Sequence, residues 1–483
     1  MADKLHTLTR VLQQDPRPAR LWRPLANGRV QCHLSPRQCK IPEGGLGFCG
    51  VRYNQGGQLV TLNYGKSVPI TEERIESEAV YHYAPGARIL SLGNIGCMLK
   101  CDFCQNWQTS QARLARDQDI ARYTPEQVVE YALRHHIGIL SWTYNDPVVW
   151  HEFVIDTARL ARQAGLKNLY KSAFAIGPEA IDELLEVMDI FSISLKSIDA
   201  DYYRKFTRGE MQPVLDGIEQ VYRAWRGNGG RGPHLEISNL CLTGRNDTLL
   251  EARKVCDWVL NRLDDQVPLH YVRFHPDYLY THVGRTSVEF LEAARRQALE
   301  AGVKFVYLGN TPATTSVDTY CPHCGQTVIL RSGEALALHL NGKDCGHCGH
   351  PLPIVMPMLA GPEAAETGAV TRSLTHVFRG PIGAAHIEQP SESLVRFVFL
   401  DADGTEAGRG QSACRRFLVS RPSARAVALR VDLAADGGNG GDQSAGEDVR
   451  VLEVFDRAHF PTAAAAQSQT GSCDVPPALV VPR

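Results

Sequence analysis

Between about residues 85 and 310, short apolar runs alternate with longer amphipathic stretches. The apolar runs are too short for helices, whereas the stretches between them repeat apolar positions every three to four residues. This alternation predicts at least six strand–helix units. The expected strands are 87–93, 137–144, 166–173, 191–197, 234–242, 269–275 and 304–310, and the expected helices are 123–136, 148–165, 178–188, 213–226, 247–263 and 287–302.

Helix-end signals support this division. Thr124 is expected to cap its helix, with Pro125 in the first helical position and Gln127 completing a capping box. Gly165 is expected to end the next helix. Repeated strand–helix units predict an α/β fold with a parallel sheet covered by helices, open or closed into a barrel. Such barrels carry their chemistry at the C-terminal ends of the strands.

The regions outside this alternation differ in character. Residues 1–84 are loop-rich and contain cysteines, 316–356 form a short cysteine-rich module, and 357–483 are rich in Ala, Gly, Ser and Pro. We therefore expect four regions, with the α/β domain spanning 85–315. Within the last region we expect two strands, at 393–404 and 424–433. Residues 434–448 and the tail after 462 are expected to be disordered.

Composition restricts the function. The chain has 483 residues, 43% of them hydrophobic and 22% charged, with a formal net charge of −2. This balance indicates a largely globular protein and argues against a dedicated nucleic-acid binder, although a local basic patch stays open. The first 25 residues lack an apolar stretch typical of a signal peptide, and no run of 18 apolar residues occurs. We therefore expect a cytoplasmic protein without a membrane partner.

Fourteen cysteines in a cytoplasmic protein require an explanation, because thiols there stay reduced. Cysteines gathered at short spacings are typical of metal sites rather than disulfides. Ten of the fourteen fall into three such groups, whose members are Cys32, Cys39 and Cys49; Cys97, Cys101 and Cys104; and Cys321, Cys324, Cys345 and Cys348.

The central group lies in a loop directly after an expected strand, with the spacing Cys97-x3-Cys101-x2-Cys104. Three thiolates can bind three irons of a [4Fe–4S] cluster and leave the fourth iron open, whereas a fully ligated cluster mainly transfers electrons. We expect S-adenosylmethionine (SAM) to bind the open iron and to be cleaved reductively to methionine and a 5′-deoxyadenosyl radical. A zinc site and thiols packed in the core are the alternatives.

The motif CxxxCxxC resembles that of the radical SAM superfamily, and more closely the branch of pyruvate formate-lyase activating enzymes. Closer still, the chain resembles the radical SAM enzymes of the AmmeMemoRadiSam system over roughly residues 25–355. The similarity is carried by stretches that include CHLSPRQCKIPEGGLGFCGVR, YHYAPGARILSLGNIGCMLKCDFCQNWQTSQ, WTYNDPVVWHEF, RFHPDY and VYLGN.

The resemblance implies a partial (β/α)6 radical SAM barrel. It also implies that the cofactor-binding residues are Thr143, Tyr144, Asn145, Asp146, Lys196 and His275. The chain departs from the family pattern at Asp146, where glutamate is usual, at Ser194, which replaces an aspartate, and at 171–175, where KSAFA stands. Bland interpretations stay open: a helix cap for Asp146, a solvated charge for Lys196 and a polar turn for His275.

The other two cysteine groups differ in spacing. Cys321-x2-Cys324 and Cys345-x2-Cys348 form two knuckles separated by 20 residues, which predicts a zinc-ribbon-like module with a structural zinc; rubredoxin-like iron and metal-free thiols are the alternatives. The spacing of Cys32, Cys39 and Cys49 fits no simple knuckle. Relatives often have cysteine where Ser35 stands, so a fourth ligand is either missing or supplied by His33. Metal binding and loop packing both stay open there.

The leading hypothesis is a radical SAM enzyme that abstracts hydrogen from an unidentified substrate. Similarity to activating enzymes suggests a glycyl-radical protein as the partner, and similarity to the AmmeMemoRadiSam group suggests Memo-like and AMMECR-like proteins. A flavodoxin or ferredoxin is the expected electron donor. The alternative from another class is a non-enzymatic iron–sulfur and zinc protein for redox sensing or scaffolding.

Overall fold

The computed structural model describes residues 4–227, 232–311, 315–332 and 335–357, together with the backbone of eight strands between Val370 and Val481. The chain divides into two compact units, the first comprising Met1–Pro312 with Pro357–Pro362 and the second Ala313–Met356 with Glu363–Arg483. None of the described helices combines the length and the apolar character needed to cross a bilayer.

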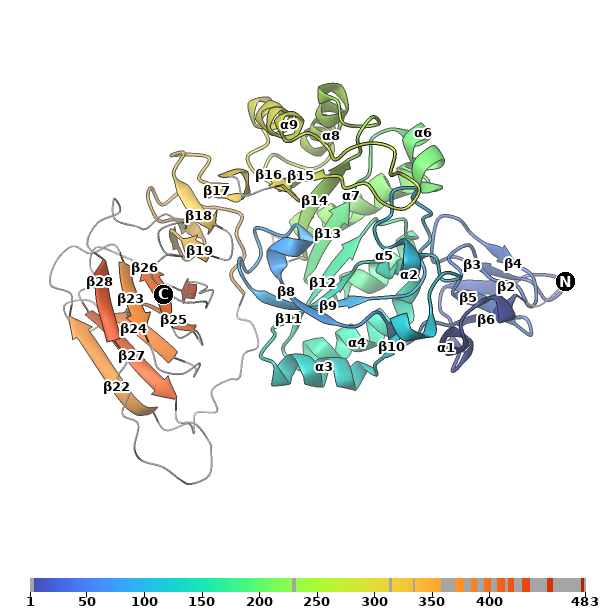
Figure 1. Cartoon of the computed structure of the whole chain (residues 1–483), viewed down its shortest axis with the longest axis horizontal. Coiled ribbons are helices and arrows are strands. Elements are labelled where there is room, and N and C mark those ends of the chain that lie inside the picture. Colours follow the sequence, from blue (N-terminus) through green and yellow to red (C-terminus); the bar gives the residue numbers. More distant parts are fainter. Residues whose placement is uncertain are drawn as a thin grey trace. The chain divides into compact units, whose positions relative to one another are not determined.

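A parallel sheet forms the core of the first unit, and its strands lie side by side in chain order (Figure 1). β8 (Thr71–Arg74) adds an antiparallel strand at one edge. Six strand–helix repeats followed by a seventh parallel strand confirm the predicted α/β partial barrel. The parallel strands are β9 (Arg88–Gly93), β11 (Ile139–Thr143), β12 (Lys167–Ser172), β13 (Ile190–Ser194), β14 (His234–Cys241), β15 (Leu269–Arg273) and β16 (Val306–Gly309).

Helices connect successive parallel strands and lie around the sheet (Figure 1). Thr124 accepts a hydrogen bond from the Gln127 amide while the Gln127 side chain accepts one from the Thr124 amide, so the predicted capping box is present. Short elements also follow β13, where α6 (Ala200–Tyr202) leads into a π-helical turn, η5 (Tyr203–Thr207). The main helices are α3 (Pro125–Arg134), α4 (His151–Gln163), α5 (Pro178–Leu185), α7 (Gln212–Gly227), α8 (Leu249–Arg262) and α9 (Val288–Ala301).

The N-terminal segment belongs to the same compact unit and is built from very short strands. A buried ion pair ties it to the barrel: Arg52 in β5 lies 2.5 Å from the carboxylate of Glu152 in α4. The segment contains α1 (Arg10–Gln13) and two three-stranded sheets. One sheet consists of β1 (Arg17–Pro18), β6 (Gln58–Thr61) and β5 (Arg52–Gln55), and the other of β2 (Trp22–Pro24), β3 (Val30–Cys32) and β4 (Lys40–Ile41). A further strand, β7 (Lys66–Ser67), pairs with β10 (Ala121–Arg122).

The second unit is antiparallel throughout its described sheets. Its cysteine-rich part comprises β17 (Thr319–Tyr320), β18 (Thr327–Ser332), β19 (Ala335–Leu338), β20 (Leu340–Asn341) and β21 (Asp344–Cys345). Its remaining strands form a five-stranded sheet, β22 (Val370–Val377), β27 (Ala428–Ala434), β24 (Val395–Leu400), β25 (Glu406–Ser412) and β29 (Leu479–Val481), and a three-stranded sheet, β26 (Arg416–Ser420), β23 (Ala384–Glu388) and β28 (Arg450–Val454).

The two strands expected in this C-terminal region are present as β24 and β27, which pair with each other. Six further strands were not predicted, and one of them, β29, lies within the tail that was expected to be disordered. Apart from Ala434 and β29, the segments with predicted disorder lie outside the described residues.

Candidate active site

The cysteine loop, residues 94–106, follows β9 and carries Cys97, Cys101 and Cys104. Gly96 begins its turn with a φ of +91°, and a Cβ atom at this position would lie 2.8 Å from Val51 and 3.0 Å from the carbonyl oxygen of Cys49. Only glycine therefore fits this turn without displacing the N-terminal segment. The close packing fixes the start of the cysteine loop against that segment.

Two backbone hydrogen bonds to one neighbouring turn hold the rest of the loop. The amides of Lys100 and Asp102 donate to the carbonyl oxygens of Thr207 and Phe206, at 2.9 and 3.1 Å. Both acceptors belong to the π-helical turn η5, a kind of distortion that is frequent at functional sites. The loop thus has fixed backbone anchors before any cofactor is considered.

A cavity of about 540 Å³ lies at the C-terminal ends of the parallel strands, where the fold predicts the chemistry. Cys101 and Cys104 line it, whereas Cys97 is buried in the loop and does not. The other lining residues come mainly from the ends of β12 to β16 and from the segment before β9. They include Glu76, Tyr81, Tyr144, Lys171, Ser194, Lys196, Ser238, His270, His275 and Asn310.

The donor set of the cysteine loop fits a cluster better than a single ion. Among the described residues, four cysteines bring their Sγ atoms within 4.8 Å of one another, as ligands of a single ion do: Cys321, Cys324, Cys345 and Cys348. The three thiols of the loop do not belong to that group, and three ligands are what a cubane with one open corner requires. Burial raises the pKa of Cys97 to about 12, so its thiolate form depends on a bound cation.

Three of the predicted SAM-binding residues line the cavity together with the two cysteines: Tyr144, Lys196 and His275. The Tyr144 hydroxyl donates to Glu73 at 2.8 Å, and its backbone has a φ of +62°. Such a conformation is uncommon outside glycine and marks a constrained residue. Lys196 also influences the cysteine loop. Burial raises the pKa of the Cys101 thiol, and the positive charge of Lys196 opposes this rise.

The other three predicted residues do not line the cavity and hold the wall behind it. Thr143 donates to the buried carboxylate of Glu78 at 2.9 Å. The side-chain amide of Asn145 donates, at 2.5 Å, to the backbone carbonyl oxygen of Asn94 in the cysteine loop. The Asp146 carboxylate accepts hydrogen bonds from the backbone amide of Val148 and, at 2.7 Å, from the Ser172 hydroxyl. The bond from Val148 is the helix cap that was the alternative interpretation of Asp146. Their SAM contacts stay a prediction.

A polar layer inside the barrel was not singled out from the sequence. Glu236 in β14 lies between His234 and His270, which donate to its carboxylate at 2.9 and 2.7 Å. Although burial opposes it, these hydrogen bonds lower the pKa of Glu236 well below its usual range. Lys171 in β12 faces the same cavity. The signal in the sequence that could have revealed this layer was Glu236 itself, a charged residue within the otherwise buried strand β14.

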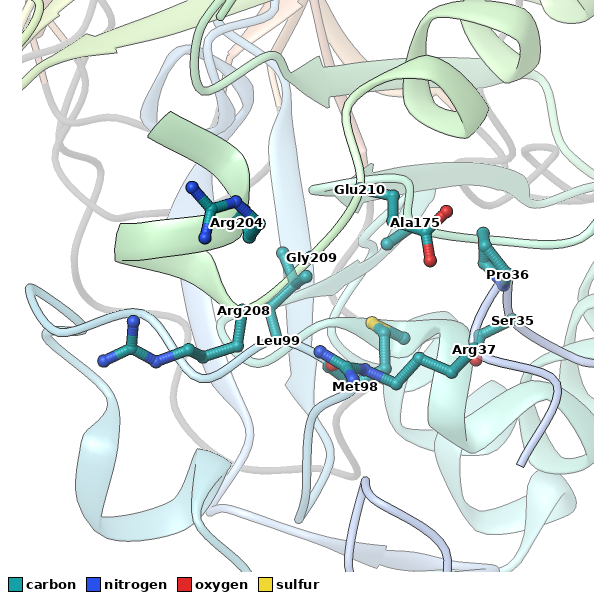
Figure 2. A pocket seen from close by; sticks show the side chains of 10 residues that line it. All are labelled: Ser35, Pro36, Arg37, Met98, Leu99, Ala175, Arg204, Arg208, Gly209 and Glu210. Atoms are coloured by element: carbon teal, nitrogen blue, oxygen red, sulfur yellow. The ribbon is translucent and has the colours of Figure 1, made fainter. Parts of the chain in front are cut away.

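A second cavity, of about 390 Å³, lies on another side of the cysteine loop, where Met98 and Leu99 line it (Figure 2). Arg37 lies along the loop in this cavity and donates to the Met98 carbonyl oxygen at 3.2 Å. Arg204 and Arg208 also line it and pair with Asp201 and Asp102. A local cluster of arginines therefore exists despite the neutral overall charge.

The predicted knuckles of the second unit converge. The Sγ atoms of Cys321 and Cys348 are 3.8 Å apart, and those of Cys324 and Cys345 are 3.7 Å apart. In both knuckles a glycine amide, of Gly325 or Gly349, donates to the carbonyl oxygen of the first cysteine. Four thiols at these distances can hold one metal ion between them.

The N-terminal cysteines Cys32, Cys39 and Cys49 line one small cavity of about 20 Å³. Ser35 lines it too, whereas the ring of His33 instead meets the Gln38 side chain, with Nδ1 2.9 Å from Oε1. The structure thus brings the three thiols around one point, and their metal binding stays open.

Comparison with known proteins extends these observations. Residues 94–247, which contain the cysteine loop and most of the cavity wall, match the family model of the radical SAM superfamily. The "Uncharacterized protein MJ0808" of Methanocaldococcus jannaschii is 35% identical over 344 residues, which cover 70% of this chain and 100% of that protein. The similarity therefore includes the N-terminal segment or the module beyond the barrel as well as the barrel itself.

The pyruvate formate-lyase-activating enzyme of Listeria monocytogenes is 26% identical over 143 residues, 27% of this chain and 56% of that enzyme. Among solved structures, a radical SAM methyltransferase from Sphaerobacter thermophilus aligns with a TM-score of 0.36 and 16% identity, over 50% of this chain and 71% of that one. A domain of an activating enzyme from Bacteroides vulgatus aligns with a TM-score of 0.30 and 17% identity, over 35% and 98%. On the family model, residues 94–247 form a radical SAM domain, and the members of this superfamily are enzymes that use a [4Fe–4S] cluster and SAM.

Proposed function

We propose that this enzyme cleaves SAM reductively at a cluster held by Cys97, Cys101 and Cys104 and abstracts a hydrogen atom from its substrate. One observation carries the proposal: three thiols stand on an anchored loop, and two of them line a polar cavity of about 540 Å³ at the strand ends. Three ligands leave one corner of a cubane for SAM, and the cavity provides its room.

The residues around the cavity have distinct tasks. Cys97, Cys101 and Cys104 hold three irons, and Tyr144, Lys196 and His275 are placed to contact SAM. When bound, the reduced cluster supplies one electron to SAM, whose cleavage gives methionine and the 5′-deoxyadenosyl radical. Buried residues of β12 to β16 form the wall behind the cavity.

Two substrate classes have support. The stretches that resemble the AmmeMemoRadiSam group, such as CHLSPRQCKIPEGGLGFCGVR, support a substrate shared with Memo-like and AMMECR-like partners. The shorter match to the Listeria activating enzyme supports a glycyl-radical protein as the target. A flavodoxin or ferredoxin is the proposed electron donor for either reaction.

We further assign a structural zinc to Cys321, Cys324, Cys345 and Cys348. Four converging thiols close the coordination sphere, so the ion stabilises the module and leaves no position for a substrate. The surrounding strands are two to six residues long, and a short antiparallel sheet of this size depends on such a metal for its stability.

The test uses the full chain, reconstituted with iron and sulfide without oxygen. Mixed with SAM and dithionite, it should release 5′-deoxyadenosine and methionine in equal amounts, measured by chromatography and mass spectrometry. The Cys97→Ala variant is the control and should release none. Absence of 5′-deoxyadenosine from the wild type, or equal release from both proteins, would reject the enzyme and leave the redox-sensing or scaffold alternative.

A further inference from the structure

A lysine that the SAM reaction does not require stands in the wall of the 540 Å³ cavity. Lys171 is the penultimate residue of β12, and its ammonium group donates to Ser192 in β13 at 3.0 Å and to Ser238 in β14 at 3.1 Å. An ammonium group has three N–H donors, so these two hydrogen bonds leave one. Because the side chain lines the cavity, that donor is available to a ligand there.

The charge of Lys171 is not cancelled by a direct ion pair. Within the described part of the chain, no carboxylate oxygen lies within 4.0 Å of its Nζ atom. The nearby Glu78 accepts hydrogen bonds from Ser141 and Thr143, and Glu236 is held by two histidines. Burial lowers the pKa of Lys171 to about 8, while the charge of Glu78 opposes this shift, so the lysine still carries its proton at neutral pH.

The side chains around Lys171 leave room for a ligand. Ser194 and Ser238 are small and line the cavity from β13 and β14, where larger residues would fill a barrel of this kind. Their hydroxyls provide hydrogen-bond donors and acceptors instead of apolar packing. A polar recess with a cation at its wall fits a charged group better than a hydrocarbon.

The charges that line the cavity are predominantly positive. Lys171 and Lys196 are cationic, His270 and His275 add imidazole rings, and Glu76 is the carboxylate among the lining residues. The Glu76 carboxylate accepts from the amide of Gly86 at 2.8 Å, so a backbone donor already engages it. Electrostatic complementarity therefore favours a negatively charged group as the occupant.

We propose that Lys171 binds an anionic group of the substrate, a carboxylate or a phosphate, in the recess lined by Ser194 and Ser238 beside the SAM site. The assignment rests on the proposed function, because it concerns the substrate of that same cavity. It makes Lys171 a specificity-determining residue: the charge-assisted hydrogen bond selects anionic molecules, and its fixed position orients them toward the cysteine loop.

The experiment titrates the reconstituted full chain, with SAM present and no reductant, with acetate and with inorganic phosphate by calorimetry. Acetamide serves as the uncharged counterpart of acetate. We expect the wild type to bind one of the two anions and not acetamide, and the stronger of the two identifies the substrate's group. Lys171→Met should weaken that binding by about tenfold or more, Lys171→Arg should retain most of it, and Lys304→Met, an exposed lysine elsewhere, is the matched control.

Two results would overturn the proposal: neither anion binds the wild type, or Lys171→Met binds as the wild type does. The KM for SAM in the uncoupled cleavage reaction is measured for the same variants. A rise in this KM as large as the loss of anion affinity would assign Lys171 to SAM and also overturn the proposal. Failure of the proposed function is read separately, because it appears as a wild type that binds the anion and releases no 5′-deoxyadenosine.

Discussion

Two cysteine sites in this chain use the same ligand atom for different ends. In the second unit, four thiols converge to within 4.8 Å and surround a point completely. In the first unit, three thiols stand on a loop between the N-terminal segment and η5, and two of them face a cavity of about 540 Å³. We expect the three-thiol site, with room for a ligand next to it, to be the reactive one and the closed four-thiol site to be structural.

The largest expected effect comes from matched substitutions at the two sites. Cys104→Ala removes one of three cluster ligands and should reduce 5′-deoxyadenosine release to that of a protein-free mixture. Cys348→Ala removes one of four ligands in the closed site and should leave release per bound cluster within a few-fold of the wild type. Equal losses in the two variants would erase the functional distinction between the sites.

Removal of the metal from the closed site should have a large effect on structure instead. In Cys324→Ser, the amides of β17 to β19 should lose their protection in hydrogen exchange, because a structural metal of this type contributes on the order of 10 kcal/mol to folding. Amides of β11 to β13 in the barrel should keep theirs. Full protection of β17 to β19 in the variant would show that the module folds without a metal.

A buried charge in the barrel gives the next effect. Glu236→Gln should cost about 3–5 kcal/mol at pH 7, because it leaves His234 and His270 with one weaker partner. Denaturation is followed by tryptophan fluorescence, since all six tryptophans lie before residue 312 and so report on the first unit alone.

The stability difference between the wild type and Glu236→Gln should depend on pH, because the pKa of Glu236 is lowered in the folded wild type. Its stabilising contribution is fully present above the unfolded-state pKa of about 4.3 and is lost as the pH falls toward the folded-state value. The difference between wild type and Glu236→Gln should therefore shrink below about pH 4. A difference that stays constant to lower pH would show that the lost contribution is packing rather than charge.

The smallest expected effect comes from the N-terminal cap of α3. Thr124→Ala removes the side-chain cap of α3 and should cost about 1 kcal/mol of unfolding free energy in the first unit, without changing 5′-deoxyadenosine release. This variant calibrates the other comparisons, because it shows how much activity changes when stability alone is lowered. A large loss of activity would mean that small losses of stability reach the cysteine loop.

The sequence predicted what depends on neighbours along the chain. All seven parallel strands, the capping box at Thr124 and the paired knuckles of the tetrathiolate were predicted, because period, cap and spacing are local patterns. The edge strand β8 was missed, since its polar sequence TEER lacks an apolar pattern. Six of the eight described strands after residue 357 were also missed.

The polar layer of the barrel could not be predicted in this way. Lys171 meets Ser192 and Ser238, which lie 21 and 67 residues further along the chain, so their meeting depends on strand register. The resemblance placed six SAM-binding residues at the strand ends, and the structure brings Tyr144, Lys196 and His275 to the cavity while the other three support its wall. Which residues of one turn face inward is decided by the backbone path, and the spacing does not reveal it.

The most direct measurement is the metal content of the oxygen-free, reconstituted chain, determined for the wild type and for the variant with alanine at residues 97, 101 and 104. We expect about four iron atoms per wild-type chain, at the loop, to be lost in the variant, with the zinc retained. Zinc or no metal at the loop of the wild type, or an iron content that the three substitutions leave unchanged, would contradict the account.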